Sequence, residues 1–187
     1  MNVEVYSISD IEDIFKEQNL DIKEYLSRFT IGVNSKIQDF FRDSALARNR
    51  ENVCRTFIVI DLDSDPLDNI VGYFSLTITY RKINEDVSKS LKRKISSDAE
   101  RHNIFSATLI SKLGRADKYK GKISGKEIMN LALETCYQIY ELTGLRHVCV
   151  DYYDNEALEE FYLNRSGFKK YQHDDEQGLN YCFYKFS

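Results

Sequence analysis

The sequence is poor in the residues that break a chain into linkers or cross-link it. Among its 187 residues it has one proline, eight glycines and no tryptophan, which argues against long flexible linkers. The four cysteines are widely separated and lack the close pairs that zinc sites show. They are Cys54, Cys136, Cys149 and Cys182. Three of them lie in apolar periodic segments, so we expect buried thiols rather than ligands or nucleophiles.

Metal ligands and membrane segments are equally scarce. His102, His147 and His173 have no cysteine or carboxylate at ligand spacing, so we expect no metal site. No apolar run approaches the length of a membrane span. The first residues, MNVEVYSISDIEDIF, are acidic, unlike the basic and then apolar start of a signal peptide. We therefore expect a cytoplasmic protein that does not bind a membrane.

Apolar and aromatic residues are abundant. Hydrophobic residues make up 42% of the chain and aromatic residues 13%, with 13 tyrosines and 11 phenylalanines. This composition excludes wholesale disorder. The length is sufficient for one domain over residues 1–187 with a full core.

Charge is unevenly distributed along the chain. Residues 81–126 contain 13 lysines and arginines against 5 acidic residues, a local charge of +8. Because the whole chain carries −4, the remainder carries −12. One part of the surface is thus expected to attract polyanions while the whole protein stays acidic. A solvated charged face is the alternative.

Hydrophobic periodicity predicts a mixed α/β protein. Apolar residues at helical spacing predict two or three short helices between residues 12 and 41, and further helices over 86–95, 124–142 and 155–163. β-branched and aromatic runs predict strands at 55–60, 70–80, 105–113, 147–152, 168–171 and 181–186. The first two strands are expected to form a hairpin. A strand–helix–strand crossover predicts that the strands at 105–113 and 147–152 are parallel and splayed, with ligand space at their carboxyl ends.

A phosphate-binding turn is predicted between one strand and the next helix. After the strand at 105–113 comes the basic loop Lys118-Tyr119-Lys120-Gly121-Lys122. Ser124 is the expected N-cap, and Glu127 completes a capping box. The first amides of a helix lack internal partners and carry partial positive charge. This arrangement is typical of a site that binds a diphosphate.

Four groups of residues in this half of the chain resemble one enzyme family. They are Lys112–Asp117 (KLGRAD), Lys120–Gly125 (KGKISG), Asn155 with Phe161-Tyr162 seven residues later, and Ser166-Gly167-Phe168. From about residue 40 to 171 the sequence resembles the GCN5-related N-acetyltransferase (GNAT) family. The resemblance implies a mixed, mostly antiparallel sheet with one splayed parallel pair, flanked by helices. It also implies acetyl-CoA as co-substrate.

The resemblance also implies a set of site residues. The pantetheine arm of acetyl-CoA would lie along Leu113, Gly114 and Arg115, and Asn155 would contact the pantetheine or the thioester. Residues for the diphosphate would be Lys120, Gly121, Lys122, Ile123, Ser124, Gly125 and Lys126. Tyr162 would be the catalytic residue, giving a proton to the departing thiolate or orienting the thioester. A free phenol, with a pKa of about 10, suits proton exchange with an alkyl thiol.

Three upstream segments resemble a toxin-type branch of the family. They are DFFRDSAL, CRTFIVI and GYFSL, which begin at Asp39, Cys54 and Gly72. The resemblance implies acetylation of the amino group of aminoacyl-tRNA, a small antitoxin as partner, and a possible homodimer. In the basic stretch SKSLKRK, helical spacing places Lys89, Lys92 and Arg93 on one face, where they are expected to contact the tRNA backbone.

The sequence departs from the family pattern at two points. Ile123 stands where the family has its first glycine of the diphosphate turn, and β-branched residues tolerate positive φ poorly. One extra residue separates Tyr162 from Gly167. Two other functions therefore stay open: an N-acetyltransferase acting on a small molecule or a protein, and a degenerate CoA-binding interaction module.

Overall fold

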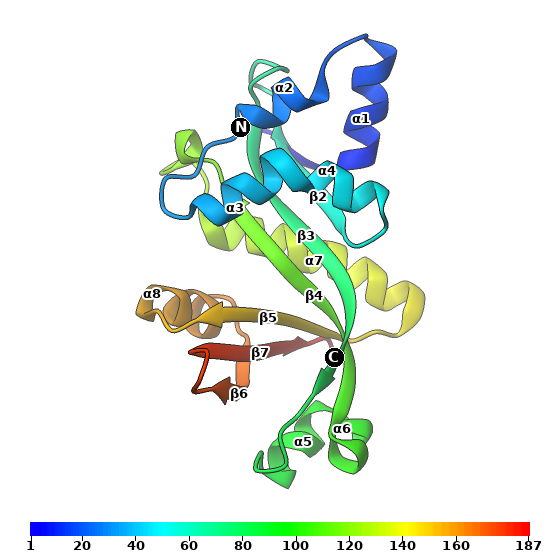
Figure 1. The fold of residues 1–187 in the computed structure, drawn as a ribbon, viewed down its shortest axis with the longest axis vertical. Helices are drawn as coiled ribbons and strands as arrows, with labels where there is room; N and C mark the ends of the chain where they lie inside the picture. The colour runs from blue at the N-terminus through cyan, green and yellow to red at the C-terminus, as the bar shows by residue number, and fades with distance from the viewer. The chain divides into compact units, whose positions relative to one another are not determined.

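The computed structural model describes residues 1–187, which divide into two compact units. The first unit comprises Met1–Thr77 and Ser111–Leu131, and the second comprises Ile78–Ile110 and Ala132–Ser187. The strands β3 (Ile70–Lys82) and β4 (Ile104–Arg115) and the helix α7 (Gly125–Thr143) contribute residues to both units (Figure 1). The expectation of a single domain stays a prediction.

The first unit is built on an antiparallel sheet. The predicted hairpin is confirmed, because β2 (Arg55–Asp61) pairs with β3, with Ile58 opposite Tyr73. The sequence reading missed β1 (Val3–Ser7), which pairs antiparallel with β2. Only two of its five residues are aliphatic, so its strand character comes from the partner strand rather than from its own pattern.

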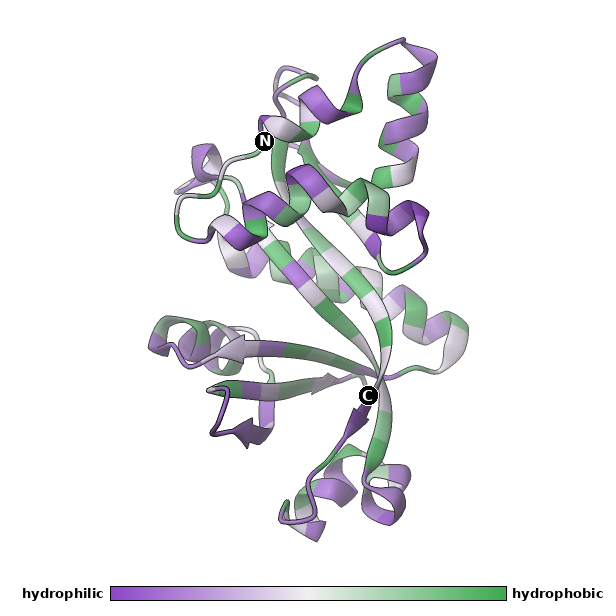
Figure 2. Cartoon of the chain, in the orientation of Figure 1, coloured by the Kyte–Doolittle hydropathy of each residue, from purple (hydrophilic) through white to green (hydrophobic).

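Short helices cover the first unit, more of them than the two or three predicted between residues 12 and 41. They are α1 (Ile8–Glu17), α2 (Ile22–Ser27), α3 (Ser35–Asp39), the π-helical η1 (Phe40–Ser44) and α4 (Ala45–Arg50). The rings of Phe29 and Phe41 lie 4.7 Å apart, and that of Phe41 lies 4.4 Å from Tyr73. The helices and β3 are thus joined by a buried aromatic cluster. Hydrophobic residues are concentrated on β4 and on most of β3, whereas β6 is hydrophilic (Figure 2).

Two glycines of the first unit are required by close packing. A Cβ atom at Gly72 would lie 2.6 Å from the carbonyl oxygen of Gly114. A Cβ atom at Gly114 would lie 2.6 Å from Ile31 and 2.8 Å from Ile37. Because contacts this short are forbidden, Gly114 of the predicted pantetheine segment is needed for packing, whatever else it does.

The second unit contains the predicted parallel pair. β4 and β5 (His147–Tyr153) run parallel, with Thr108 opposite Val148 and Leu109 opposite Cys149. β7 (Leu179–Lys185) pairs antiparallel with β5 and with β6 (Lys169–Asp174). The seven strands are therefore mostly antiparallel with one parallel pair, as the sequence predicts. The core here includes Ile83, Ile95, Ala99, Phe105, Cys149, Tyr171 and Phe183.

The helices of the second unit follow the prediction with two differences. The expected helix over 86–95 is α5 (Lys89–Ile95), and a second short helix, α6 (Ser97–His102), was missed. Ser96 begins α6 by accepting a hydrogen bond from Ala99 N. The predicted helix over 155–163 is α8 (Glu156–Glu159) followed by the π-helical η3 (Glu160–Arg165). α7 ends before Gly144, whose φ of +74° explains the predicted stop.

The cysteines are buried and free, as expected. Burial raises the pKa values of Cys136 and Cys182 to about 12, so both remain thiols at neutral pH. No group of three or more His, Cys, Asp or Glu side chains is placed to hold a metal ion. No helix has the length and apolar character needed to cross a bilayer.

Candidate active site

The turn that follows β4 has its positive φ at a glycine, not at Ile123. A short 3₁₀ turn, η2 (Asp117–Tyr119), leads into it. Gly121 has φ +83° with no atom near its would-be Cβ, while Ile123 has a negative φ and is only 4% exposed. The amide of Ile123 donates to the carbonyl of Tyr119 at 3.2 Å. The departure at Ile123 therefore strains no backbone, because Gly121 supplies the flexible position and Ile123 fills the core.

We expect Ile123→Gly to weaken folding without improving the turn. The substitution removes a buried side chain beside the surface, and at such sites the free energy of unfolding falls by about 2 kcal/mol. Because the turn already has its glycine, the affinity for acetyl-CoA is not expected to rise. Denaturant unfolding and isothermal titration calorimetry measure the two effects. Tighter acetyl-CoA binding by the variant would contradict this account of the turn.

The predicted capping box forms at the start of α7. The amide of Ser124 donates to the Glu127 carboxylate at 2.7 Å, and the amide of Glu127 donates to Ser124 Oγ at 3.2 Å. The amides of Gly125 and Lys126 have no acceptor in the chain. These two donors, at the positive end of a 19-residue helix, remain available to an anion.

Lysines around the turn differ in their availability. Lys118 is bonded to the Asp68 side chain, and its ammonium also lies 5.4 Å from the Tyr119 ring centroid. The ammonium groups of Lys120, Lys122 and Lys126 form no ion pair. All three lysines among the predicted diphosphate residues are thus free of carboxylates. Lys122 also lies over the Tyr119 ring, at 5.4 Å, which holds it near the turn.

Glu127 places a negative charge beside the free amides, and its removal is a test of the site. Hydrogen bonds from the amide and hydroxyl of Ser124 lower the pKa of Glu127, so it is ionised at neutral pH. A glutamine keeps the reciprocal cap but not the charge. We therefore expect Glu127→Gln to bind acetyl-CoA about threefold more tightly at low salt, since an exposed charge interacts only weakly with a nearby ligand. Calorimetry at two salt concentrations measures the change, and the gain should shrink at high salt.

The side chain of Arg115 is bonded to the turn that precedes α7. Its Nη1 donates to the carbonyl of Ile123 at 3.1 Å, and its Nε is buried without a partner. The side chain of this predicted pantetheine residue therefore reaches the diphosphate turn. Leu113, at the end of the same strand, is half-buried.

Tyr162 is held in the second unit by aromatic rings. Its ring stacks on Tyr152 at 5.0 Å and 23°, and meets Phe168 edge-on at 6.1 Å. The hydroxyl forms no hydrogen bond within the chain. Burial raises the pKa of Tyr162 to about 12, so the phenol stays protonated at neutral pH. A fixed ring with an unpaired O–H is suited to donate a hydrogen bond to a ligand.

The π-helical turn η3 explains the extra residue near Tyr162. An i→i+5 turn contains one residue more than an α-helical turn, so it absorbs an insertion inside a helix. Tyr162 lies within this turn, and its carbonyl accepts a hydrogen bond from Phe168 N at 3.0 Å. Gly167 takes φ +77° between them. The insertion is therefore accommodated without lengthening the connection to β6.

Asn155 has a capping role that uses half of its side chain. Its Oδ1 accepts a hydrogen bond from Leu158 N at 3.1 Å and begins α8. Only the amide NH₂ group remains to contact pantetheine or a thioester. Asn155 and Tyr162 lie in the second unit, whereas the predicted residues from Leu113 to Lys126 lie in the first.

The predicted nucleic-acid face on α5 is wrong for Lys92. This side chain is only 5% exposed, and its ammonium donates to the carbonyl of Glu85 at 3.1 Å. Arg93 is exposed but bonded to Glu100 at 2.8 Å. Lys89 is exposed and forms no ion pair. The spacing rule placed the three residues on one face, but that face packs partly against the second unit's own loop.

The expectation that His173 has no carboxylate at ligand spacing is wrong, because two carboxylates lie beside its ring. Its Nδ1 lies 2.8 Å from Asp175 Oδ1, and its Nε2 lies 3.1 Å from Asp154 Oδ1. Hydrogen bonds with Asp175 and then Asp154 raise the pKa of His173. The pairing of β7 with both β5 and β6 brings Asp154 near, although it is 19 residues away in sequence. Asp175 is only two residues from His173 in the sequence, whereas the contact with Asp154 depends on the fold.

The strand arrangement is the one that the resemblance implies: seven mostly antiparallel strands with one parallel pair, flanked by helices. No family model matches the sequence, and no curated protein does. Solved structures match over almost the whole chain. AtaT complexed with acetyl-methionyl-tRNAfMet has a TM-score of 0.74 at 17% identity, with 98% of this chain and 95% of that chain covered.

Two further solved structures have the same fold. A Tyr→Phe mutant of KacT has a TM-score of 0.73 at 16% identity, with 99% of this chain and 95% of that chain covered. A structure described as a bacterial toxin has a TM-score of 0.71 at 20% identity, with 98% and 90% covered. These likenesses establish that the chain has the fold of these toxins.

Proposed function

We propose that the protein transfers the acetyl group of acetyl-CoA to the α-amino group of an aminoacyl-tRNA. The observation that carries the proposal is the turn at the start of α7, where the free amides of Gly125 and Lys126 meet unpaired lysines. Such a turn suits a diphosphate, which acetyl-CoA contains. The shared fold supports the choice of acceptor, because AtaT was solved with acetyl-methionyl-tRNAfMet and also with acetyl-CoA.

The chemistry of the acceptor is consistent with the residues present. The neutral amine attacks the carbonyl carbon of the thioester, the C–S bond breaks, and the proton lost by nitrogen matches the one gained by sulfur. The amine of an aminoacyl ester has a low pKa, so direct attack needs no strong enzymic base. Lys120, Lys122 and Lys126 would hold the diphosphate, while Leu113, Gly114 and Arg115 would hold the pantetheine arm.

Tyr162 is proposed to act on the departing thiolate. Its pKa of about 12 lies well above that of an alkyl thiol, so full proton transfer to the thiolate would be uphill. The phenol would therefore stabilise the developing negative charge on sulfur by donating a hydrogen bond. Solved structures of AtaT and of KacT carry a Tyr→Phe substitution, which supports a tyrosine as the residue to test.

Partners and location follow from the same proposal. AtaT has been solved bound to the C-terminus of the antitoxin AtaR, and KacTA with DNA. For this chain we propose a small antitoxin, a homodimer as the assembly, and the cytoplasm, where charged tRNA is found.

The test is to incubate the purified protein with labelled acetyl-CoA and total charged tRNA. We expect label on the α-amino group of aminoacyl-tRNA and none on deacylated tRNA, polyamines or protein. Label on a polyamine or protein instead would identify a different acetyltransferase. Calorimetry with acetyl-CoA provides the second arm, since absence of heat at high micromolar ligand would favour the interaction module and overturn the proposal.

A further inference from the structure

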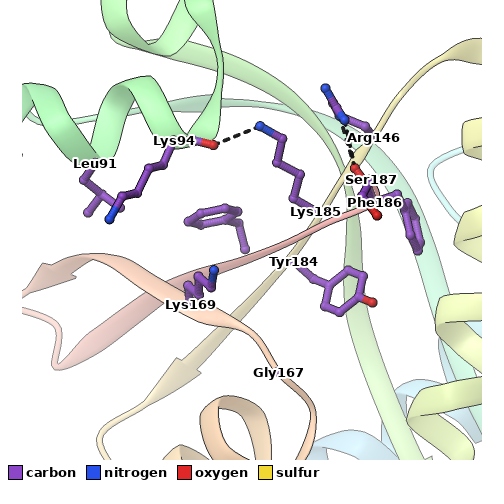
Figure 3. Close-up of a pocket in the computed structure, with 10 residues that line it drawn as sticks. Leu91, Lys94, Arg146, Gly167, Lys169, Tyr184, Lys185, Phe186 and Ser187 are labelled. Carbon is purple, nitrogen blue, oxygen red and sulfur yellow. Dashed lines mark hydrogen bonds between the residues drawn. The ribbon is translucent and has the colours of Figure 1, made fainter.

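A cavity of about 470 Å³ lies in the second unit, and none of the residues predicted from the sequence to form a site lines it. It is bounded by the end of α5, by β6 and by the end of β7 (Figure 3). The lining residues are Leu91, Lys94, Arg146, Gly167, Lys169, Phe183, Tyr184, Lys185, Phe186 and Ser187. Its size is within the range of ligand sites in proteins.

Four cations and no aspartate or glutamate line this cavity. Lys185 donates to the carbonyls of Lys94 at 2.9 Å and Ile95 at 2.8 Å, and Arg146 donates to the carbonyl of Phe186 at 3.1 Å. These hydrogen bonds to carbonyl oxygens fix the two cations, and neither cation forms an ion pair. The exposed ammonium groups of Lys94 and Lys169 have no partner at all, and the two side chains extend into the space between α5 and β6 (Figure 3).

The cavity differs from the rest of the charged surface. Some exposed cations of the second unit pair with acids, as Arg93 does with Glu100 and Lys170 with Glu159, whereas none of the four cations in the cavity does. Here the cations repel one another: burial and then the charge of Arg146 lower the pKa of Lys185. A concave site lined by one sign of charge focuses the field and attracts counter-ions. An uncompensated cluster of this kind is costly to folding, so a bound anion is the expected complement.

We propose that this cavity binds the phosphate backbone of the RNA substrate, with Lys94 and Lys169 as the contacting side chains and Arg146 and Lys185 as the fixed charges behind them. The inference rests on the proposed function for the identity of the RNA as tRNA. We propose this cavity as the RNA site in place of the predicted face of α5, because Lys92 on that face is buried. Lysines provide point charges for phosphate oxygens.

The cavity offers little to a base. Among the aromatic residues of its lining, Phe183 is 3% exposed and Phe186 9%, so neither presents an open ring face, and only Tyr184 is partly exposed. Backbone contacts fix position and carry no sequence information. We therefore expect this contact to be independent of RNA sequence and strongly dependent on salt.

The test is the double variant Lys94→Glu/Lys169→Glu, which alters no hydrogen bond of the folded chain. Loss of two phosphate contacts should weaken binding of fluorescent uncharged tRNA about tenfold at 0.15 M salt. The slope of log K against log salt should fall by about 1.4, since each contact to a single strand contributes about 0.7. Acetylation of a small aminoacyl ester should be unchanged, because no predicted catalytic or acetyl-CoA residue is altered.

The matched control is Lys23→Glu/Lys36→Glu, two exposed and unpaired lysines of the first unit with the same change of charge. An equal loss of tRNA affinity in both pairs, or no loss in either, would overturn the proposal. So would a change of oligomeric state in the Lys94→Glu/Lys169→Glu variant, because the cavity would then be a contact between subunits. If the wild-type protein acetylates no charged tRNA but the binding difference persists, the proposed reaction fails and the RNA site stands.

Discussion

Tyr162→Phe should reduce the rate of acetyl transfer at least 100-fold while leaving the affinity for acetyl-CoA nearly unchanged. A positioned acid or hydrogen-bond donor contributes about 10²–10⁴ to a rate. The variant loses only the hydroxyl, which has no partner within the chain, so the stacking on Tyr152 is kept and folding should not suffer. Single-turnover rates with charged tRNA and calorimetry with acetyl-CoA measure the two quantities.

Tyr80→Phe is the matched control for this variant. Tyr80 is 77% exposed, and its ring contacts no other aromatic side chain. We expect the control to keep full activity. A rate for Tyr162→Phe within threefold of the wild type would remove Tyr162 from the mechanism. Because the pKa of Tyr162 is raised to about 12, its protonated form persists across neutral pH. The wild-type rate should thus not decline between pH 7 and 10 through ionisation of this phenol.

Asp151→Ala should lower the free energy of unfolding by about 3 kcal/mol. Asp151 Oδ1 lies 2.5 Å from Arg81 Nη2, and the two side chains are 25% and 12% exposed. Removing the carboxylate leaves a largely buried guanidinium without compensation, a change that costs about 3–5 kcal/mol at buried pairs. We expect a cost at the lower end of this range because the Asp151 side chain is partly solvated. Denaturant unfolding followed by circular dichroism measures the effect.

A second variant separates charge from packing at this pair. Replacing both groups by apolar residues, Arg81→Met/Asp151→Leu, should recover most of the lost stability, since the unpaired charge is gone. The exposed pair of Glu159 with Lys170 is the control, and Glu159→Ala should cost less than about 1 kcal/mol. If Asp151→Ala costs no more than Glu159→Ala, the Arg81–Asp151 pair is solvated and contributes no more than a surface pair.

Local sequence signals predicted much of the fold and the turn. The capping box of Ser124 and Glu127 formed as expected, because both partners lie within one helical turn. Gly144 ended α7, and the hairpin of β2 with β3 formed between two adjacent apolar runs. The roles of Gly125 and Tyr162 at the site remain predictions, since they rest on a resemblance and no ligand contact tests them.

The errors arose where a side chain has a partner outside its own helix or strand. Lys92 reads as a surface residue on a basic helix, yet its ammonium is bonded to the carbonyl of Glu85, seven residues earlier. His173 reads as isolated, yet strand pairing brings it to Asp154. β1 has too few apolar residues to be recognised as a strand from its sequence. It forms because it pairs with the edge of β2.

By itself the sequence determined most of the helices and strands, where α7 begins and ends, and that a basic turn follows β4. These properties depend on neighbours within a few residues, and side-chain periodicity and capping express them directly. Tertiary structure alone decided which cations are free. The unpaired cluster combines Lys94 with Arg146, Lys169 and Lys185, which lie outside the basic stretch of residues 81–126. Charge in a sequence can be counted, but burial and ion pairing depend on partners that only the folded chain brings together.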